Sequence, residues 1–320
     1  MAGAAPEWDR FWRYDRLSSF ETGPGAANYS GETAEGWRRF FADVPDGGRI
    51  LDIATGNGAI AVLAVEAARE AGKKFQVTGV DFADIAPEQF VTTSEALGQV
   101  TFRGRTNAED LPFEDGSFDA VTSQFGIEYS DMGRSLPEAT RVLKKGGRLR
   151  LAMHAAEGAV VSDTNRSLAD ADFLLDSAQL IPLAVVSLSS LVAWEEGKQL
   201  QDKARADHAR FREALDAVER HELGAMDRQM LASVRRDLIE AFNTHRSKRL
   251  EDQLVEMQAL ESQVRDHRER QRALARSAVS RAQVESFAAT LANAGFANAR
   301  VGEQRREEAL LAHTIEATAP

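Results

Sequence analysis

The chain has 320 residues, a formal net charge of −11 and no cysteine. Its length allows one large domain with an insertion, or two domains. The absence of cysteine excludes disulfides, thiolate metal ligands and cysteine nucleophiles. The acidic balance argues against nucleic-acid binding, which needs a basic surface. Because no apolar run follows a basic patch in the first residues, we predict a cytoplasmic enzyme without a secretory signal.

Residues 1–41 are rich in aromatic side chains and hold three of the four tryptophans. Their spacing predicts amphipathic helices that are separated at Gly23-Pro24-Gly25. These helices can simply pack onto a sheet, or they can form a lid that excludes water from a bound ligand. The two interpretations are compatible.

Between residues 42 and 154, strand and helix signals alternate. Predicted strands cover 49–54, 75–80, 100–103, 120–123 and 148–153, and predicted helices cover 60–71, 87–97 and 136–143. Lys144-Lys145-Gly146-Gly147 has the basic residues and glycines typical of a helix C-terminus. Repeated βα units of this size predict a parallel, doubly wound sheet.

Residues 155–279 interrupt this alternation. Beyond Glu195 the spacing predicts two or three long helices, in which basic and acidic residues nearly balance, as on a solvated helical face. The alternation returns in residues 280–320, which predict a helix over 284–294 and strands over 297–302 and 309–318. The helical block is therefore predicted to be an insertion before the final helix and hairpin.

The uncharged segment Ser177–Trp194 is at the lower edge of membrane-spanning length. It contains Pro182, Gln179 and several serines, and a single span here would separate later strands from the sheet that they must join. We therefore predict a buried helix or the wall of an apolar pocket, and no membrane span.

A glycine-containing turn, Thr55-Gly56-Asn57-Gly58, follows the first predicted strand and precedes a helix. Such a turn lets a ligand approach free backbone amides. Asp81 ends the second predicted strand, where it can accept hydrogen bonds from both hydroxyls of a ribose. These two features suit a nicotinamide nucleotide or S-adenosylmethionine (AdoMet), and the turn alone can also be an ordinary tight turn.

Asp52 separates the two nucleotide interpretations. It lies inside the first strand just before the glycines, where its charge would repel a pyrophosphate. A carboxylate at this position suits a cationic ligand, and AdoMet carries an ammonium and a sulfonium.

Further segments follow in a fixed order: DIATGNG at 52–58, VDF at 80–82, NAEDLPFEDGSFD at 107–119 and RVLKKGG at 141–147. In this combination the chain resembles the class I AdoMet-dependent methyltransferases, most of all the group that includes the ubiquinone/menaquinone C-methyltransferases. The resemblance covers roughly residues 28–154 and returns at Ala294-Gly295-Phe296 and the last two strands. It implies an α/β fold with a Rossmann-like, doubly wound seven-stranded sheet whose last strand is antiparallel.

The resemblance also implies roles for individual residues. Asp52 and the turn Ala54-Thr55-Gly56-Asn57-Gly58 would hold the methionine part of AdoMet, with Gln124 lining that side and Tyr29 closing over the cofactor. Asp81 would bind the ribose and Phe82 would lie beside the adenine. Asn107 and Ala108 would contact the adenine edge.

Three residues depart from the family's pattern: Ala54 replaces a frequent glycine, Asn107 a common aspartate and Lys145 the proline of the K-P-G-G turn. The amide oxygen of Asn107 can still accept a hydrogen bond from an adenine amine. Asp119 belongs to the signature, and we assign it a structural role only.

Methyl transfer from a sulfonium mainly requires alignment and exclusion of water, and a general base only if the acceptor loses a proton. Glu128, Tyr129 and His154 follow strands on the predicted cofactor side and are the candidates for that base. The alternative for His154 is a loop histidine without a catalytic role. No histidine pair has the spacing of a metal site, so we predict no metal.

We therefore predict an AdoMet-dependent methyltransferase acting on a small, lipophilic or aromatic acceptor through an O, C or N atom. We divide the chain into a helical lid (1–41), an AdoMet-binding core (42–154), an insertion (155–279) and a C-terminal helix and hairpin (280–320). Within the insertion, Phe173–Trp194 would wall the acceptor site, and the charged helices would cap it or form a homodimer. A bundle with no role beyond burial is the alternative. For the whole chain the alternatives are a nicotinamide-dependent oxidoreductase and a catalytically silent AdoMet-binding scaffold.

Overall fold

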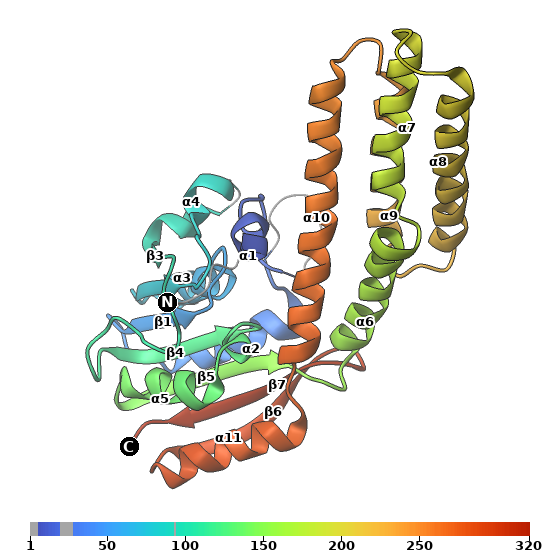
Figure 1. Ribbon diagram of the computed structural model, residues 1–320. Helices are drawn as coiled ribbons and strands as arrows, with labels where there is room; N and C mark the ends of the chain where they lie inside the picture. Colours follow the sequence, from blue (N-terminus) through green and yellow to red (C-terminus); the bar gives the residue numbers. More distant parts are fainter. Residues whose placement is uncertain (1–5, 20–27, 93) are drawn as a thin grey trace. The chain divides into compact units, whose positions relative to one another are not determined.

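The computed structural model describes residues 6–19, 28–92 and 94–320 and divides them into two compact units (Figure 1). The first unit combines the chain up to Val161 with Leu274–Pro320, and the second is Ser162–Ala273. The chain passes into the second unit within helix α6 (Ala159–Asp172) and returns within helix α10 (Leu250–Ser277).

A mixed sheet of seven strands, among the described residues, forms the centre of the first unit in the order β3-β2-β1-β4-β5-β7-β6. The strands are β1 (Arg49–Ile53), β2 (Gln76–Val80), β3 (Val100–Arg103), β4 (Phe118–Gln124), β5 (Leu143–His154), β6 (Ala297–Arg306) and β7 (Ala309–Thr318). Strands β1 to β5 pair in parallel, and β7 runs antiparallel to both of its neighbours, β5 and β6. The predicted Rossmann-like, doubly wound sheet with an antiparallel last strand is confirmed.

Helices cover both faces of this sheet, because neighbouring strand residues point to opposite sides. On one face α2 and α3 pack against residues such as Ile50 and Ala152, and on the other α5 and α11 pack against residues such as Leu51 and Leu151. The helices of this unit are α1 (Pro6–Phe11), α2 (Gly31–Ala42), α3 (Ala59–Glu70), α4 (Pro87–Phe90), η1 (Glu95–Gln99), η2 (Ile127–Tyr129), α5 (Met132–Arg141) and α11 (Arg281–Asn293).

The order of the strands determines where a ligand can bind. The chain runs outward from β1 to β2 and β3, then returns to the other side of β1 with β4. Loops that leave β1 and β4 therefore diverge, and the crevice between them at the carboxyl ends of the strands is the usual binding position in open α/β sheets. Ala54 follows β1 at this point and Phe125 follows β4.

Two local predictions were wrong. The helix expected over 87–97 consists only of the short α4 and the 3-10 turn η1, because Val91 is extended and Thr92 bonds instead to Asp15 through its backbone N–H and its hydroxyl. The Lys144–Gly147 turn does not end a helix: α5 already ends at Arg141, and the turn belongs to β5, where the pairing with β4 shifts register. Backbone bonds between this turn and Ala319 hold it there.

The aromatic N-terminal region contributes two helices. Helix α2 buries Trp37, Phe40 and Phe41 against the sheet, as its spacing predicts. Helix α1 has no buried residue and is attached through Asp9, which accepts bonds from the Asp84 backbone N–H at 2.8 Å and the Arg105 guanidinium at 2.7 Å. The predicted break at Gly23–Gly25 lies outside the described residues.

The second unit is a bundle of helices with its own hydrophobic core (Figure 1). It consists of α7 (Leu180–Glu195), α8 (Gln201–Glu222), α9 (Arg228–Asn243), the π-helical turn η3 (Phe173–Ser177), and most of α6 and α10. The expectation of two or three long helices after Glu195 is confirmed by α8, α9 and α10.

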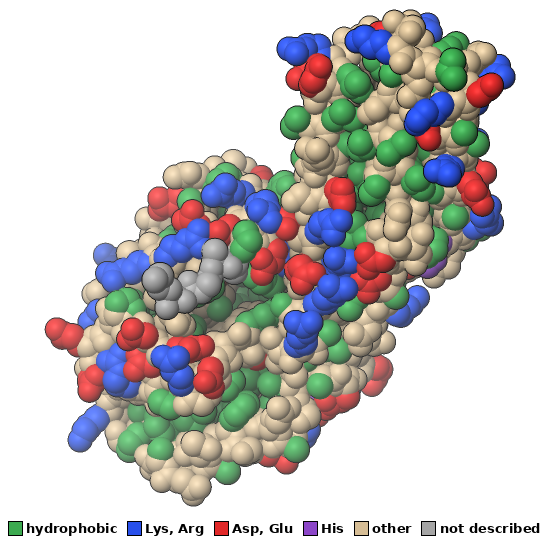
Figure 2. Space-filling model, viewed as in Figure 1, with side chains coloured by type: hydrophobic (Ala, Val, Ile, Leu, Met, Phe, Trp, Pro, Cys, Tyr) green, Lys and Arg blue, Asp and Glu red, His purple; other side chains and the backbone are tan. Residues whose placement is uncertain are grey.

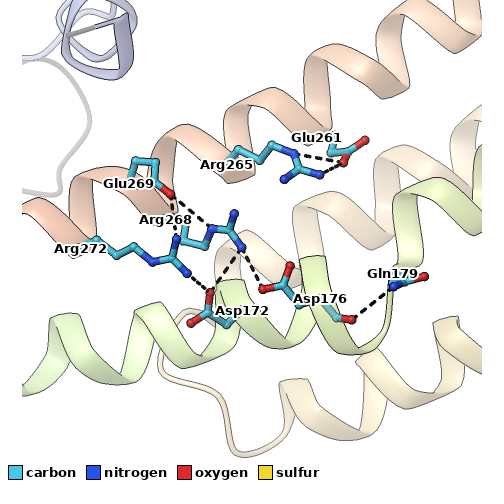
Figure 3. Close-up of polar contacts among 8 residues, drawn as sticks. All are labelled: Asp172, Asp176, Gln179, Glu261, Arg265, Arg268, Glu269 and Arg272. Carbon is cyan, nitrogen blue, oxygen red and sulfur yellow. Dashed lines mark hydrogen bonds and ion pairs between the residues drawn. The ribbon is translucent and has the colours of Figure 1, made fainter. Parts of the chain in front are cut away.

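Charged side chains of both signs are interspersed over the visible face of this bundle (Figure 2). Many form ion pairs between neighbouring helices. Arg268 and Arg272 of α10 both reach Asp172 of α6, and Arg268 also contacts Asp176 at 3.0 Å (Figure 3). Ion pairs that are partly open to solvent, like these, contribute little stability individually, so the apolar core carries most of the stability of the bundle.

The apolar segment around α7 is partly exposed. The stretch Ala159–Glu195 comprises α6, η3 and α7, with an interruption at Ala178–Gln179, where Gln179 has a positive φ of 48°. By length and composition it could cross a membrane, and a third of its most apolar window is buried. Leu180, Ile181 and Leu188 face the core of the bundle, while the side chains of Val186 and Trp194 lie on its surface. The helix is therefore buried on one face only.

Candidate active site

A cavity of about 360 Å³ opens at the carboxyl ends of β1, β2 and β4. It contains four of the predicted cofactor residues that follow β2 and β3, namely Asp81, Phe82, Asn107 and Ala108. The rest of its wall comes from the N-terminal region, from the ends of β1 and β4 and from the segments after β2 and β3: Trp8, Trp12, Ile53, Ala54, Ala83, Thr106, Glu109, Phe125, Gly126, Tyr129 and Ser130.

A second, smaller cavity of about 30 Å³ lies beside the first and shares Trp12, Ala54 and Phe125 with it. It contains the predicted methionine-side residues Tyr29, Asp52, Thr55 and Gln124. The structure thus places the predicted cofactor residues, except Gly56 and Gly58, around two adjoining compartments.

Trp12 forms part of the wall of both compartments and packs directly on the glycine turn. A Cβ atom added to Gly56, whose φ is +54°, would lie 2.5 Å from the Trp12 ring. Gly56 must therefore be glycine in this conformation. A Cβ on Gly58 would similarly meet the Phe102 ring at 2.6 Å, so Gly58 packs against a side chain of this protein, and neither glycine lines a compartment.

Asp81 connects the end of β2 to the glycine turn. Its carboxylate accepts hydrogen bonds from the backbone N–H groups of Gly56 and Ala83, both at 2.8 Å. Burial raises the pKa of Asp81 to about 6, although these two bonds lower it. A carboxylate has further lone pairs, which can accept bonds from a ligand's hydroxyls.

Asp52 is almost completely buried below the turn. One oxygen accepts a bond from the Thr55 hydroxyl at 2.6 Å and the other from the Thr122 hydroxyl at 2.8 Å. Burial raises the pKa of Asp52 to about 7 against these bonds, and the nearby Asp81 raises it further. No cationic side chain is among the causes of either pKa shift. Two buried carboxyl groups in this state fit a positively charged ligand, which would stabilise their ionised forms.

Asn107 and Gln124 differ in what they can offer a ligand. The side-chain oxygen of Asn107 accepts a bond from the Glu109 backbone N–H at 3.0 Å, so it is partly used within its own loop. Gln124 is only 7% exposed, and its oxygen accepts a bond from the Trp37 indole N–H at 2.7 Å. Its Nε2 atom has no hydrogen-bond partner among the residues that the structure describes.

The three candidates for a general base lie together at the ends of β4 and β5. The Nδ1 atom of His154 is 2.7 Å from the Glu128 carboxylate, which also accepts a bond from the His154 backbone N–H at 3.0 Å. The imidazole stacks on Phe125, with ring centroids 4.3 Å apart. Of the three candidates only Tyr129 lines a compartment, and burial raises its pKa well above the usual value.

Sequence reasoning offered the aromatic region 1–41 as a lid, but it did not single out Trp8 and Trp12 as lining residues, and it missed Phe125. The aromatic N-terminal region was the available signal for the tryptophans, but spacing along the chain does not say where such rings pack. Phe125 has a positive φ of +56° directly after β4, and no pattern in the sequence predicts that backbone conformation. Asp119, by contrast, has its expected structural role, because it binds the Arg49 backbone N–H and the Lys144 ammonium.

The protein combines a doubly wound sheet with an antiparallel β7, a glycine turn after β1, acids in β1 and after β2, and a cavity at the switch point. This is the arrangement typical of class I AdoMet-dependent methyltransferases. Residues 30–164 match the ubiE/COQ5 methyltransferase family. The family resemblance inferred from the motifs is confirmed, and the cofactor of this class is AdoMet.

Curated relatives are similar over the same region. The chain is 38% identical to the ubiquinone/menaquinone biosynthesis C-methyltransferase UbiE of Geotalea daltonii, over 35% of this chain and 49% of that protein. It is 40% identical to a demethylmenaquinone methyltransferase of Thermus thermophilus, over 35% of this chain and 51% of that protein. The chain thus spans about half the length of the curated relatives it matches.

Among solved structures, an S-adenosylmethionine-dependent methyltransferase from Mesorhizobium loti is 19% identical, with a TM-score of 0.31 over 38% of this chain and 55% of that one. The family match ends at residue 164, close to the start of the second unit at Ser162. Most of the second unit therefore lies outside the matched region.

Proposed function

We propose that this chain transfers a methyl group from AdoMet to a small lipophilic or aromatic acceptor. One observation carries the proposal: two buried carboxyl groups, Asp52 and Asp81, flank the glycine turn with raised pKa values and no cation beside them among the described residues. The names of the curated relatives favour a quinone-like ring as the acceptor, by similarity.

The two compartments suit the two ends of AdoMet. Asp81, Phe82, Asn107 and Ala108 would bind the adenosine in the larger compartment. The methionine end would lie in the smaller one, lined by Tyr29, Asp52, Ala54, Thr55 and Gln124, with the turn backbone at Gly56 and Gly58 beside it.

When bound, AdoMet supplies a methyl group on a sulfonium, which is an activated and uncharged leaving group. The protein then has to align the acceptor and exclude water. Trp8, Trp12 and Phe125 give the larger compartment aromatic walls that serve this purpose. Their rings also suit a cationic sulfur, because the face of an aromatic ring attracts positive charge.

We further propose His154 as the general base for acceptors that lose a proton. Its imidazole is buried and lines neither compartment, so this role requires the site to open toward His154 when the acceptor binds. The Glu128 carboxylate accepts a hydrogen bond from His154 Nδ1, which favours the tautomer of His154 with the proton on Nδ1. The Nε2 atom of His154 is then the basic nitrogen. Glu128 would orient the imidazole. Tyr129, whose raised pKa keeps its phenol protonated, would donate a hydrogen bond and would not act as a base.

The second unit would contribute to binding of the methyl acceptor. Helix α7 carries apolar side chains on its surface, including Val186 and Trp194, which suit contact with a lipophilic molecule. Walling of the acceptor by Phe173–Trp194, homodimer formation through the charged helices, and a cytoplasmic location without nucleic-acid partners all stay predictions.

The experiment that tests this function is acceptor screening with the full chain and methyl-labelled AdoMet, measuring release of S-adenosylhomocysteine. The panel should contain demethylated quinols, catechols, phenols and amines. We expect labelled product with ring acceptors and none with the matched Asp81→Ala chain. If neither AdoMet nor S-adenosylhomocysteine binds, and NAD does, the chain is the alternative nicotinamide-dependent oxidoreductase. Binding of AdoMet without turnover of any acceptor would favour the silent scaffold.

A further inference from the structure

Trp37 of α2 and Gln124 at the end of β4 are joined by a buried hydrogen bond. The indole Nε1–H donates to the Gln124 side-chain oxygen at 2.7 Å, and the Trp37 side chain is completely buried. Trp37 lines neither compartment, whereas Gln124 lines the smaller one. The bond therefore connects the core between α2 and the sheet to the predicted methionine site.

This bond fixes the orientation of the Gln124 amide, which belongs to a residue that lines the smaller compartment. An indole N–H can only donate a hydrogen bond, so the amide oxygen must face Trp37. The Nε2 atom then faces the other way, and it is buried without a partner among the described residues. A buried donor in this state favours any ligand that brings an acceptor oxygen.

The smaller compartment thus offers two opposite groups. Asp52 provides carboxylate oxygens, which accept hydrogen bonds, and Gln124 provides an amide N–H group, which donates. The amino-acid end of AdoMet has the complementary pair, an ammonium and a carboxylate.

We propose that Trp37 is a positioning residue, which holds the Gln124 amide as a hydrogen-bond donor toward the carboxylate of the cofactor's methionine part. This inference rests on the proposed function. Trp37 never touches the ligand in this proposal and acts only through the orientation of Gln124.

The surroundings of Trp37 keep its ring in place. The ring stacks against Phe41, with centroids 5.9 Å apart, and meets Phe40 edge-on at the same distance. The guanidinium of Arg150 lies over the ring at 4.7 Å and is itself paired with Glu316. These ring and cation contacts pack the indole tightly in the orientation in which its N–H donates to Gln124.

The test compares two probes, S-adenosylhomocysteine and its decarboxylated form, which keeps the adenosine and the ammonium but lacks the carboxylate. Binding of each to the full chain is measured by calorimetry. Trp37→Phe keeps an aromatic ring and removes the N–H, so the amide is free to turn. We expect the variant to bind S-adenosylhomocysteine about tenfold more weakly and the decarboxylated probe unchanged. Equal weakening of both probes would overturn the proposal, because it would mean that Trp37 only supports packing.

Gln124→Glu provides the second variant, in case Trp37→Phe does not fold. The new side chain can still accept the Trp37 bond, but it presents a carboxylate to the cavity instead of a donor. We expect it to reverse the preference, with the decarboxylated probe binding more tightly than S-adenosylhomocysteine. An unchanged preference for S-adenosylhomocysteine would contradict the proposal.

Phe41→Leu is the matched control, because Phe41 is buried in the same aromatic cluster and is joined to Trp37 only by ring stacking. We expect it to change both affinities equally. Failure of the proposed function gives a different result from failure of this inference. If the proposed function is wrong, the unmodified chain binds neither probe. If only this inference is wrong, the unmodified chain binds both probes, and Trp37→Phe changes both affinities equally.

Discussion

Asp81 accepts a hydrogen bond from the backbone N–H of Gly56 at 2.8 Å, which joins the end of β2 to the turn that follows β1. A single side chain therefore shapes the glycine turn and also lines the larger compartment. Removing its charge should disturb the cofactor site in both respects.

For Asp81→Asn we expect AdoMet to bind about ten- to a hundredfold more weakly, the scale of losing a charge-assisted hydrogen bond. The amide keeps the size of the side chain but can accept with one atom only, so one of the bonds to Gly56 and Ala83 is lost as well. Calorimetric titration of both chains measures the change. Asp84→Asn is a suitable control, because Asp84 is exposed and lines neither compartment. Equal affinity of the Asp81 variant and the unmodified chain would show that this carboxylate does not bind the cofactor.

The affinity for AdoMet should rise with pH. Burial raises the pKa values of Asp52 and Asp81 to about 7 and about 6, so both carboxyl groups are largely protonated in the free protein at pH 5.5. A cationic ligand favours their ionised forms, and binding must then release protons. We expect the association constant to increase about ten- to a hundredfold between pH 5.5 and 7.5.

The free protein should show the opposite trend. A carboxyl group whose pKa is raised on folding stabilises the folded chain fully at a pH below its pKa in the unfolded chain. This stabilisation is lost as the pH rises through its pKa in the folded chain. We therefore expect the contribution of these two groups to the free energy of unfolding to decline from about pH 4 to pH 7. Thermal unfolding of the free chain at a series of pH values measures this decline. Asp52→Asn should flatten the decline while weakening AdoMet binding. If the variant reproduces the pH profile of the unmodified chain, Asp52 is not the titrating group.

Trp12 packs on Gly56 and lines both compartments, so we expect it to move aside when AdoMet occupies them. Trp12→Ala should increase the association rate constant, because the ring no longer has to leave the turn. Stopped-flow measurements with AdoMet test this, and Trp8→Ala, which changes the larger compartment only, is the control. A slower association in Trp12→Ala than in the unmodified chain would mean that the ring helps to admit the ligand.

His154→Asn should reduce turnover about a hundredfold or more for acceptors that lose a proton, the range of general-base catalysis. AdoMet binding should stay unchanged, because His154 lines neither compartment. Glu128→Gln should lower turnover less, because the glutamine oxygen can still accept a hydrogen bond from Nδ1 and orient the imidazole. Unchanged turnover in both variants would leave His154 with a structural role only.

The second unit should be dispensable for cofactor binding. The two core clusters around the sheet contain only residues of the first unit, and the third cluster contains only residues of the second. Replacing Ser162–Ala273 by a flexible glycine/serine linker should therefore preserve AdoMet binding and abolish or strongly reduce acceptor turnover. Loss of both to the same extent would argue against a role of this unit on the acceptor side.

Local patterns predicted most of the strands. The alternation of apolar runs and helical spacing correctly located β1, β2, β3 and β7, because each of these short apolar segments is bounded by turn-forming or helical segments. The pattern was wrong over 87–97, where helical spacing was outweighed by a bond between Thr92 and Asp15, far apart in the chain. It was also wrong at Lys144–Gly147, where composition typical of a helix end occurs in a bulged strand.

The sequence by itself determined the class of the fold and the chemistry offered at the end of each strand, because glycines, carboxylates and apolar periodicity act over a few neighbouring residues. Tertiary structure alone decided which distant groups meet: Trp12 on Gly56, Glu128 on His154, and Trp37 on Gln124. Side chains separated by tens of residues come together only through packing, and packing also decides which carboxyl groups are buried and which amide nitrogen is left to face a ligand.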